Sequence, residues 1–319
     1  MSRLARPLVV TLIALASPAL ADGPTSVSEI QATHDRALIR DLVAYLGKTP
    51  RPDDIDQAYL TLFNKVIEHD WFADNEAIAR AYLKEYPDGP VRPLAQIIAT
   101  MGRAQAGAFG EAVASFKALM EGLGGSEQVE FAANFADNLA GAATSAGEVD
   151  AAREVYTTVL KKFGGENASL RQKVADDLAR LDRVGRTAPT VSVTDLDGKA
   201  FRLDDLKGKY VLIDFWATWC APCLAELPRV QAAEAKFRDK GFRVVSVSLD
   251  ETKGAVADFV RVRKLPWTQI HNATCAGDLV KDFGVGSIPA TFLVDPEGKI
   301  VRLDLRGAAL DKALETLIR

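Results

Sequence analysis

Two cysteines separated by two residues, Cys220 and Cys223, are the side chains in this sequence best placed to do chemistry. They follow an apolar run typical of a buried strand and stand at the predicted start of a helix, in Trp219-Cys220-Ala221-Pro222-Cys223. Unpaired N–H groups at a helix N-terminus stabilise an anion, so the pKa of the Cys220 thiol should be lowered. We expect Cys220 to attack a substrate disulfide. Cys223, which we expect to be less exposed, would then resolve the mixed disulfide.

The same Cys-x-x-Cys pattern is also half of a zinc site, which would need two further ligands. The remaining candidates of the usual kind are Cys275 and three histidines, His34, His69 and His271. Cys275 and His271 are one helical turn apart, but nothing in the sequence brings them to Cys220. We therefore predict no metal and no cofactor beyond the redox-active disulfide. For Cys275 we favour a buried, inert thiol over a mixed disulfide or a bond between chains.

The elements that must hold the cysteines belong to a C-terminal region in which strands alternate with helices, which predicts an α/β sheet. A short hairpin around Asp197-Gly198 precedes them. We expect strands at 210–216, 242–249, 291–294 and 300–303, and helices at 221–240, 253–262 and 310–318.

The region before it, 22–184, has apolar residues at helical spacing and almost no strand pattern, which predicts an all-α domain. Residues 107–116 and 147–156 resemble each other: a glycine, then a small alanine, then an aromatic four residues later. This layout is typical of tetratricopeptide-like helical hairpins, and a third hairpin is expected over 54–86. An ordinary helical bundle is the alternative. In either case the helices offer a surface for a protein partner.

The first 21 residues have the layout of a secretory signal: a basic start, a short apolar core, and small residues before a predicted cleavage site after Ala21. A periplasmic or secreted protein is therefore expected, or a membrane-anchored one if the signal is not cleaved. The formal net charge of −4 argues against nucleic-acid binding. The predicted organisation is a signal peptide (1–21), an all-α domain (22–184), a linker (185–190) and an α/β domain (191–319).

Several stretches of the C-terminal region resemble the TlpA-like or ResA-like thiol-disulfide oxidoreductases, extracytoplasmic members of the thioredoxin superfamily. The similarity rests on segments 188–189, 195–199, 206–223, 226–228, 287–295 and 297–301, which occur in the family's order. The resemblance implies a thioredoxin-like α/β/α sandwich. It does not cover the helical half of the chain.

The resemblance also assigns roles around the dithiol. Pro289 matches the family's cis-proline, Glu226 matches an acid that tunes thiol ionisation, and Pro228 matches the residue that kinks this helix. Asp214 matches the buried acid of thioredoxin, where many relatives carry asparagine; its pKa should be raised by burial, which would let it exchange a proton with Cys223. Substrate contacts are expected from the residues beside the dithiol and the proline: Trp219, Ala221, Pro222 and Ile288. Trp216 and Trp219 flank the dithiol and are expected to shape the surface around Cys220. The alternatives are a solvated carboxylate for Glu226, a structural acid for Asp214 and core packing for Trp216.

Three functions are compatible with these features. The resemblance implies a reductant of protein disulfides, for example in cytochrome c or copper-site maturation, supplied with electrons by a membrane thiol reductase. A partner-binding or assembly protein with a secondary dithiol is the second. A thiol peroxidase is the third and is disfavoured, because Thr218 precedes Cys220 by two residues where peroxiredoxins have three.

Overall fold

The computed structural model describes residues 26–48, 53–125, 128–165, 167–275 and 277–318. The predicted signal segment lies outside these residues. The chain divides into two compact units, Met1–Asp70 and Trp71–Arg319. Among the described helices, none is both long enough and apolar enough to cross a membrane.

The described part of the first unit consists of two helices, α1 (Val27–Leu46) and α2 (Ile55–Glu68), which pack on each other. Ser26 caps α1, since its hydroxyl oxygen accepts the N–H of Glu29 at 3.1 Å. Further along, Asp35 of α1 faces Lys65 of α2 and the adjoining His69, with its carboxylate 3.2 Å and 2.8 Å from their nitrogens.

The second unit begins with six helices: α3 (Phe72–Glu85), α4 (Arg92–Gln105), α5 (Phe109–Gly122), α6 (Val129–Ala146), α7 (Val149–Phe163) and α8 (Ala168–Leu181). Gly107 turns the chain between α4 and α5 with φ of 84°, and Gly147 turns it between α6 and α7 with φ of 88°. Both angles lie in the left-handed region that glycine adopts without steric cost. The alanines at the matching positions, Ala112 and Ala152, are fully buried. The two resembling segments therefore form turns of the same geometry, and the tetratricopeptide-like repeat stays a prediction.

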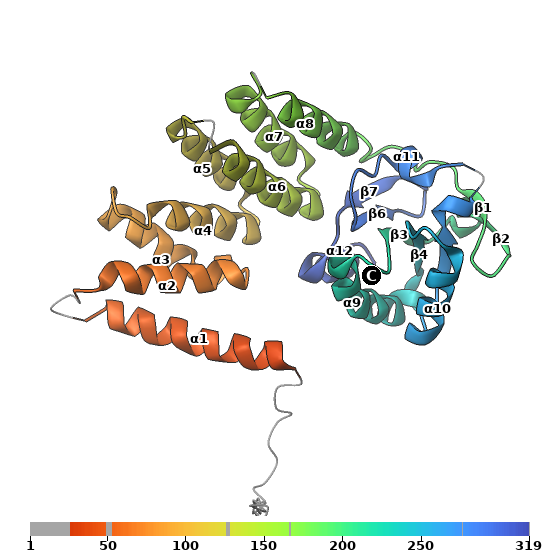
Figure 1. The fold of residues 1–319 in the computed structure, drawn as a ribbon, viewed down its shortest axis with the longest axis horizontal. Helices are drawn as coiled ribbons and strands as arrows, with labels where there is room; N and C mark the ends of the chain where they lie inside the picture. Colours follow the sequence, from red (N-terminus) through yellow and green to blue (C-terminus); the bar gives the residue numbers. More distant parts are fainter. Residues whose placement is uncertain (1–25, 49–52, 126–127, 166, 276, 319) are drawn as a thin grey trace, which may run out of the picture. The chain divides into compact units, whose positions relative to one another are not determined.

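The α/β region, blue-green to blue in Figure 1, contains a mixed five-stranded sheet with the order β5-β4-β3-β6-β7. Its strands are β3 (Tyr210–Trp216), β4 (Phe242–Ser248), β5 (Thr268–His271), β6 (Ala290–Val294) and β7 (Ile300–Leu303). Strands β3, β4 and β5 are parallel, whereas β6 runs antiparallel to both β3 and β7. A separate antiparallel hairpin, β1 (Ser192–Thr194) and β2 (Ala200–Arg202), precedes the sheet.

Helices cover both faces of this sheet. On one face, α9 (Ala221–Phe237), α10 (Lys253–Arg263) and α12 (Gly307–Leu317) share an apolar core with Leu212 and Trp216 of β3. On the other face, Phe283 of α11 (Leu279–Phe283) packs against Phe215 and Phe292. Since side chains alternate along a strand, the even-numbered residues of β3 face α9 and the odd-numbered ones face α11. The thioredoxin-like fold and the helical N-terminal region are thus confirmed.

The structure adds two observations to the predicted organisation. Strand β5 and helix α11 are absent from the predicted elements, because both are too short for a clear periodic pattern. The segment 185–190, predicted as a linker, is attached to the sheet: Gly185 N–H donates to Ile300 O, and Ala188 N–H donates to Gly298 O, at 2.8 Å and 2.9 Å. Helices α3–α8 accordingly belong to the same compact unit as the sheet.

Candidate functional site

The two cysteines lie at the junction between the end of β3 and the start of α9. Cys220 is the N-cap residue of α9, and Ala221 and Pro222 form the first turn of that helix. Cys220 and Cys223 are joined by a disulfide with an S–S distance of 2.00 Å, so the two sulfurs of the alternative zinc site are bonded to each other. The N–H of Cys223 points to Cys220 Sγ at 3.2 Å, the position from which it would stabilise a thiolate on that sulfur after reduction.

The surroundings of the disulfide are more exposed than the disulfide itself. Cys220 is 5% exposed and Cys223 is 4% exposed, so Cys223 is the less exposed of the two, as expected, by a small margin. Trp219 is 66% exposed, and Ala221 and Pro222 are exposed as well. The exposed surface beside Cys220 in the sequence is therefore made of these three residues. Trp216 is fully buried and belongs to the core.

Asp250 holds the turn that leads into the dithiol, a role the sequence does not reveal. Its carboxylate accepts the backbone N–H of Thr218 at 3.0 Å and the Thr218 hydroxyl at 2.5 Å. The Ser248 hydroxyl donates to the same carboxylate at 2.7 Å. Asp250 follows β4, the strand beside β3, and the carboxyl ends of these parallel strands meet at one sheet edge. The position of Asp250 directly after a predicted strand could have indicated this role, because residues that follow β4 lie next to residues that follow β3.

Asp214 lies in the middle of β3, on the face that α9 covers, and it is 7% exposed. Burial raises the pKa of its carboxyl to about 7, while the Ser246 hydroxyl, which donates to it at 3.3 Å, and the charge of Arg306 act to lower that pKa. Ser246 in turn accepts the indole N–H of Trp267 at 2.8 Å. A carboxyl that changes its protonation state near neutral pH has the properties required of a proton acceptor for Cys223.

Glu226 lies one turn beyond Cys223 on α9 and reaches the start of α12. Its carboxylate accepts the N–H of Gly307, the first residue of α12, at 2.8 Å. This contact places the carboxylate at the N-terminal end of α12, where the unpaired N–H groups of the helix need acceptors. Glu226 is therefore neither simply solvated nor in hydrogen-bond contact with a described sulfur; it joins the dithiol helix to α12.

The peptide bond between Ile288 and Pro289 is cis, as the resemblance implies. Ile288 is partly buried and packs against the apolar cluster to which both cysteines belong. The Pro289 carbonyl accepts a hydrogen bond from the guanidinium of Arg306. Sequence patterns do not single out Arg306, because an arginine after a strand is usually a solvated surface residue.

Cys275 does not join the dithiol. It is partly buried, and its thiol donates to the backbone carbonyl of His271 at 3.3 Å. Burial raises the pKa of this thiol, which disfavours the reactive thiolate. The His271 ring faces the Asp250 carbonyl at 2.8 Å. Both residues thus stand beside the turn that Asp250 holds.

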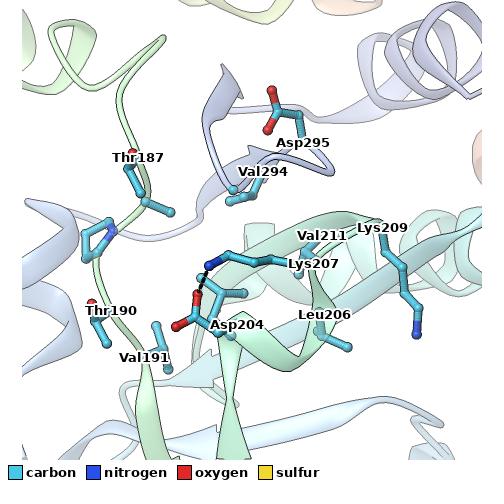
Figure 2. A pocket seen from close by; sticks show the side chains of 14 residues that line it. Thr187, Thr190, Val191, Asp204, Leu206, Lys207, Lys209, Val211, Val294 and Asp295 are labelled. Carbon is cyan, nitrogen blue, oxygen red and sulfur yellow. Dashed lines mark ion pairs between the residues drawn. The ribbon is translucent and has the colours of Figure 1, made fainter.

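Two further features are candidate binding sites, one in each unit. Asp35, Glu68 and His69 bring possible metal ligands within 4.8 Å of one another, but the Lys65 ammonium donates to both carboxylates and supplies the positive charge. The second, a small cavity of about 70 Å³ (Figure 2), lies near Val211 at the start of β3. Because the dithiol follows the opposite end of that strand, this cavity is not part of the redox site.

Comparisons with known proteins relate the chain to described sequences and structures. Residues 184–303 match the model of the AhpC/TSA family. The thiol-disulfide oxidoreductase ResA of Bacillus thuringiensis subsp. konkukian (strain 97-27) is 35% identical over 136 residues, which cover 43% of this chain and 77% of that protein. ResA of Bacillus subtilis (strain 168) is 34% identical over 119 residues, covering 37% and 65%. The thioredoxin domain of a thiol-disulfide oxidoreductase from Bacteroides vulgatus is 34% identical, covers 43% of this chain and 98% of that chain, and superposes with a TM-score of 0.40.

Proposed function

The chain belongs to the family of the ResA thiol-disulfide oxidoreductases, and we propose that it works as a reductant of protein disulfides outside the cytosol. Its substrates are protein thiols and disulfides, as its membership of this enzyme family implies. The observation that carries the proposal is the Cys220–Cys223 disulfide at the N-terminus of α9, because that position stabilises the attacking thiolate.

In the proposed reaction the Cys220 thiolate attacks one sulfur of the substrate disulfide, which forms a mixed disulfide and releases the other substrate sulfur as a thiolate. Cys223 gives up its proton to Asp214 and attacks Cys220 Sγ, which releases the second substrate sulfur. The products are a substrate dithiol and the Cys220–Cys223 disulfide, so two electrons have passed to the substrate. The proton on Asp214 then leaves to solvent or to the released thiolate.

We further propose that Trp219, Ala221 and Pro222 contact the substrate on one side of Cys220, and Ile288 and Pro289 on the other. The exposure of Trp219, Ala221 and Pro222 beside Cys220, and the packing of Ile288 against the apolar cluster that contains both cysteines, support this placement. Haem-attachment cysteines of apocytochromes or thiols of copper proteins are the proposed targets, and a membrane thiol reductase is the proposed electron donor. A periplasmic or secreted location is proposed from the pattern of residues 1–21.

Reduction of insulin by the full chain in the presence of dithiothreitol tests the activity. Wild-type protein should accelerate insulin precipitation, and Cys220→Ser should abolish the acceleration. Cys275→Ser serves as the matched control and should behave like wild type. An active Cys220→Ser variant would contradict the proposal, and peroxide consumption without disulfide reduction would favour a peroxidase.

The reduction potential of the Cys220–Cys223 couple tests the direction of electron flow. Equilibration with glutathione buffers, followed by alkylation and mass spectrometry, measures it. A value near that of thioredoxin, about −270 mV, supports a reductant, whereas a value near −120 mV would identify an oxidant.

A further inference from the structure

The segment from Asp304 to Gly307, which joins β7 to α12, lies against the redox site at its C-terminal end. Arg306 donates to the Pro289 carbonyl, and Gly307 N–H donates to Glu226 at 2.8 Å. The positive charge of Arg306 also acts on the buried carboxyl of Asp214 and lowers its pKa. Arg306 thus contacts the proline loop directly, and its charge acts on the carboxyl groups of Asp214 and Glu226.

At its other end the same segment is fixed by the helices that precede the sheet. Arg180 of α8 forms an ion pair with the Asp304 carboxylate. The Ser145 hydroxyl of α6 donates to the Asp304 carbonyl at 3.0 Å. Asp304 has φ of 53°, a left-handed conformation that is uncommon outside glycine, although aspartate tolerates it better than most residues.

The Asp304 carboxylate stands between two guanidinium groups. One of its oxygens, Oδ2, pairs with Arg180, and the other, Oδ1, lies 4.0 Å from Nη2 of Arg306 and accepts no hydrogen bond from any residue that the structure describes. The side chains of Arg180 and Asp304 are only 18% and 20% exposed. Removal of one charge from this partly buried group of Arg180, Asp304 and Arg306 leaves the remaining charges uncompensated. This raises the free energy of the folded state and favours movement of the remaining side chains.

We propose that Arg306 is a positioning residue of the dithiol site and that Asp304, anchored by Arg180 of α8, holds it in place. The helical region before the sheet is then a structural part of the redox site. This inference rests on the proposed function, because Arg306 would change the reaction by changing how readily Asp214 accepts the proton of Cys223.

The expected consequence concerns the ionisation of Asp214. Two uncharged residues lie beside Asp214 in the sheet, Ser246 of β4 and Thr291 of β6. The charges that act on its pKa are those of Arg306 and Glu226, and of these only Arg306 is positive. Displacement or loss of Arg306 should therefore raise the pKa of Asp214. A rise of one pH unit from about 7 would lower the ionised fraction at pH 7 about fivefold.

The test measures how fast Cys223 resolves a mixed disulfide between Cys220 and glutathione, by acid quenching and mass spectrometry from pH 6 to pH 9. Arg306→Met should slow this step about fivefold at pH 7 and leave it near the wild-type rate at pH 9. Arg180→Met and Asp304→Asn should also slow the resolution of the mixed disulfide at pH 7, but by a smaller factor than Arg306→Met does. Arg180→Met added to Arg306→Met should have no further effect.

Two controls separate this role from general loss of stability. Arg180→Lys retains the charge and should keep the wild-type pH profile. Arg153→Met breaks a more exposed ion pair at the end of the same helix, 2.7 Å from Arg153 to Asp182, which involves neither Asp304 nor Arg306, and should also keep that profile. Equal slowing at every pH, or unchanged profiles in folded Arg180→Met and Asp304→Asn, would overturn the inference. Failure of wild-type protein to reduce insulin would instead contradict the proposed function.

Discussion

Replacement of Asp214 by asparagine should stabilise the oxidised protein at alkaline pH and have little effect in acid. Burial raises the pKa of this carboxyl from its ordinary 3.8 to about 7. In the unfolded chain the group therefore loses its proton near pH 4, whereas in the folded chain it keeps that proton to about pH 7. Between these values the folded state binds more protons, so the wild-type protein loses stability as the pH rises.

The magnitude follows from the gap between the two pKa values. At about 1.36 kcal/mol for each pH unit, the wild-type carboxyl lowers the free energy of unfolding by about 4 kcal/mol at pH 8 and by less than about 2 kcal/mol at pH 5. Asparagine has the same size and keeps an oxygen that accepts the Ser246 hydroxyl, but it carries no charge to bury. The stabilisation by Asp214→Asn should consequently grow by about 2 to 3 kcal/mol between pH 5 and pH 8.

Urea unfolding of the oxidised full chain, followed by tryptophan fluorescence from pH 5 to pH 8.5, measures this difference. Asp204→Asn is the control, because the Lys207 ammonium beside the exposed Asp204 lowers the pKa of that carboxyl. The control should show no growing stabilisation with pH. A difference between Asp214→Asn and wild type that stays constant from pH 5 to pH 8 would refute the reasoning, since Asp214 would then not titrate in this range.

Two further predictions concern the neighbours of this carboxyl. Ser246→Ala removes the hydroxyl that donates to Asp214, so it should raise the pKa of that carboxyl. It also leaves the buried indole N–H of Trp267 without its acceptor, which should cost about 1 to 3 kcal/mol of stability. Urea unfolding at several pH values measures both effects, and Ser246→Thr should retain wild-type values. Glu226→Gln removes the negative charge at the start of α12 and should lower the free energy of unfolding at pH 7 by roughly 0.5 to 1 kcal/mol. An unchanged stability in Glu226→Gln would show that this carboxylate does not stabilise α12.

Much of the site could be predicted because its signals are local in the sequence. The apolar run ending at Trp216, the Cys-x-x-Cys after it and Pro222 in the first helical turn define the strand, the turn and the helix N-terminus without tertiary information. The positions of Gly107 and Gly147 likewise predicted two helix turns, and both glycines have positive φ. The short strand β5 lacks such a signal, because four residues are too few to establish an alternation.

The residues that sequence reasoning missed act across long separations. Asp250 accepts from Thr218 and Arg306 donates to Pro289, and each contact depends on which strands lie side by side. No local spacing encodes such contacts. How completely both cysteines are covered could not be predicted for the same reason, since it depends on which side chains of the rest of the domain pack over them.

The burial of the Cys220–Cys223 disulfide has a consequence for oxidative damage to the protein. In the oxidised state the pair has no thiol to be converted to sulfenic or sulfinic acid, and its sulfurs are almost completely shielded. Cys275, partly buried and unbonded, is the remaining thiol of the chain. While Cys220 and Cys223 are joined, oxidative damage to cysteine should therefore begin at Cys275, at a pace slowed by the raised pKa of its thiol.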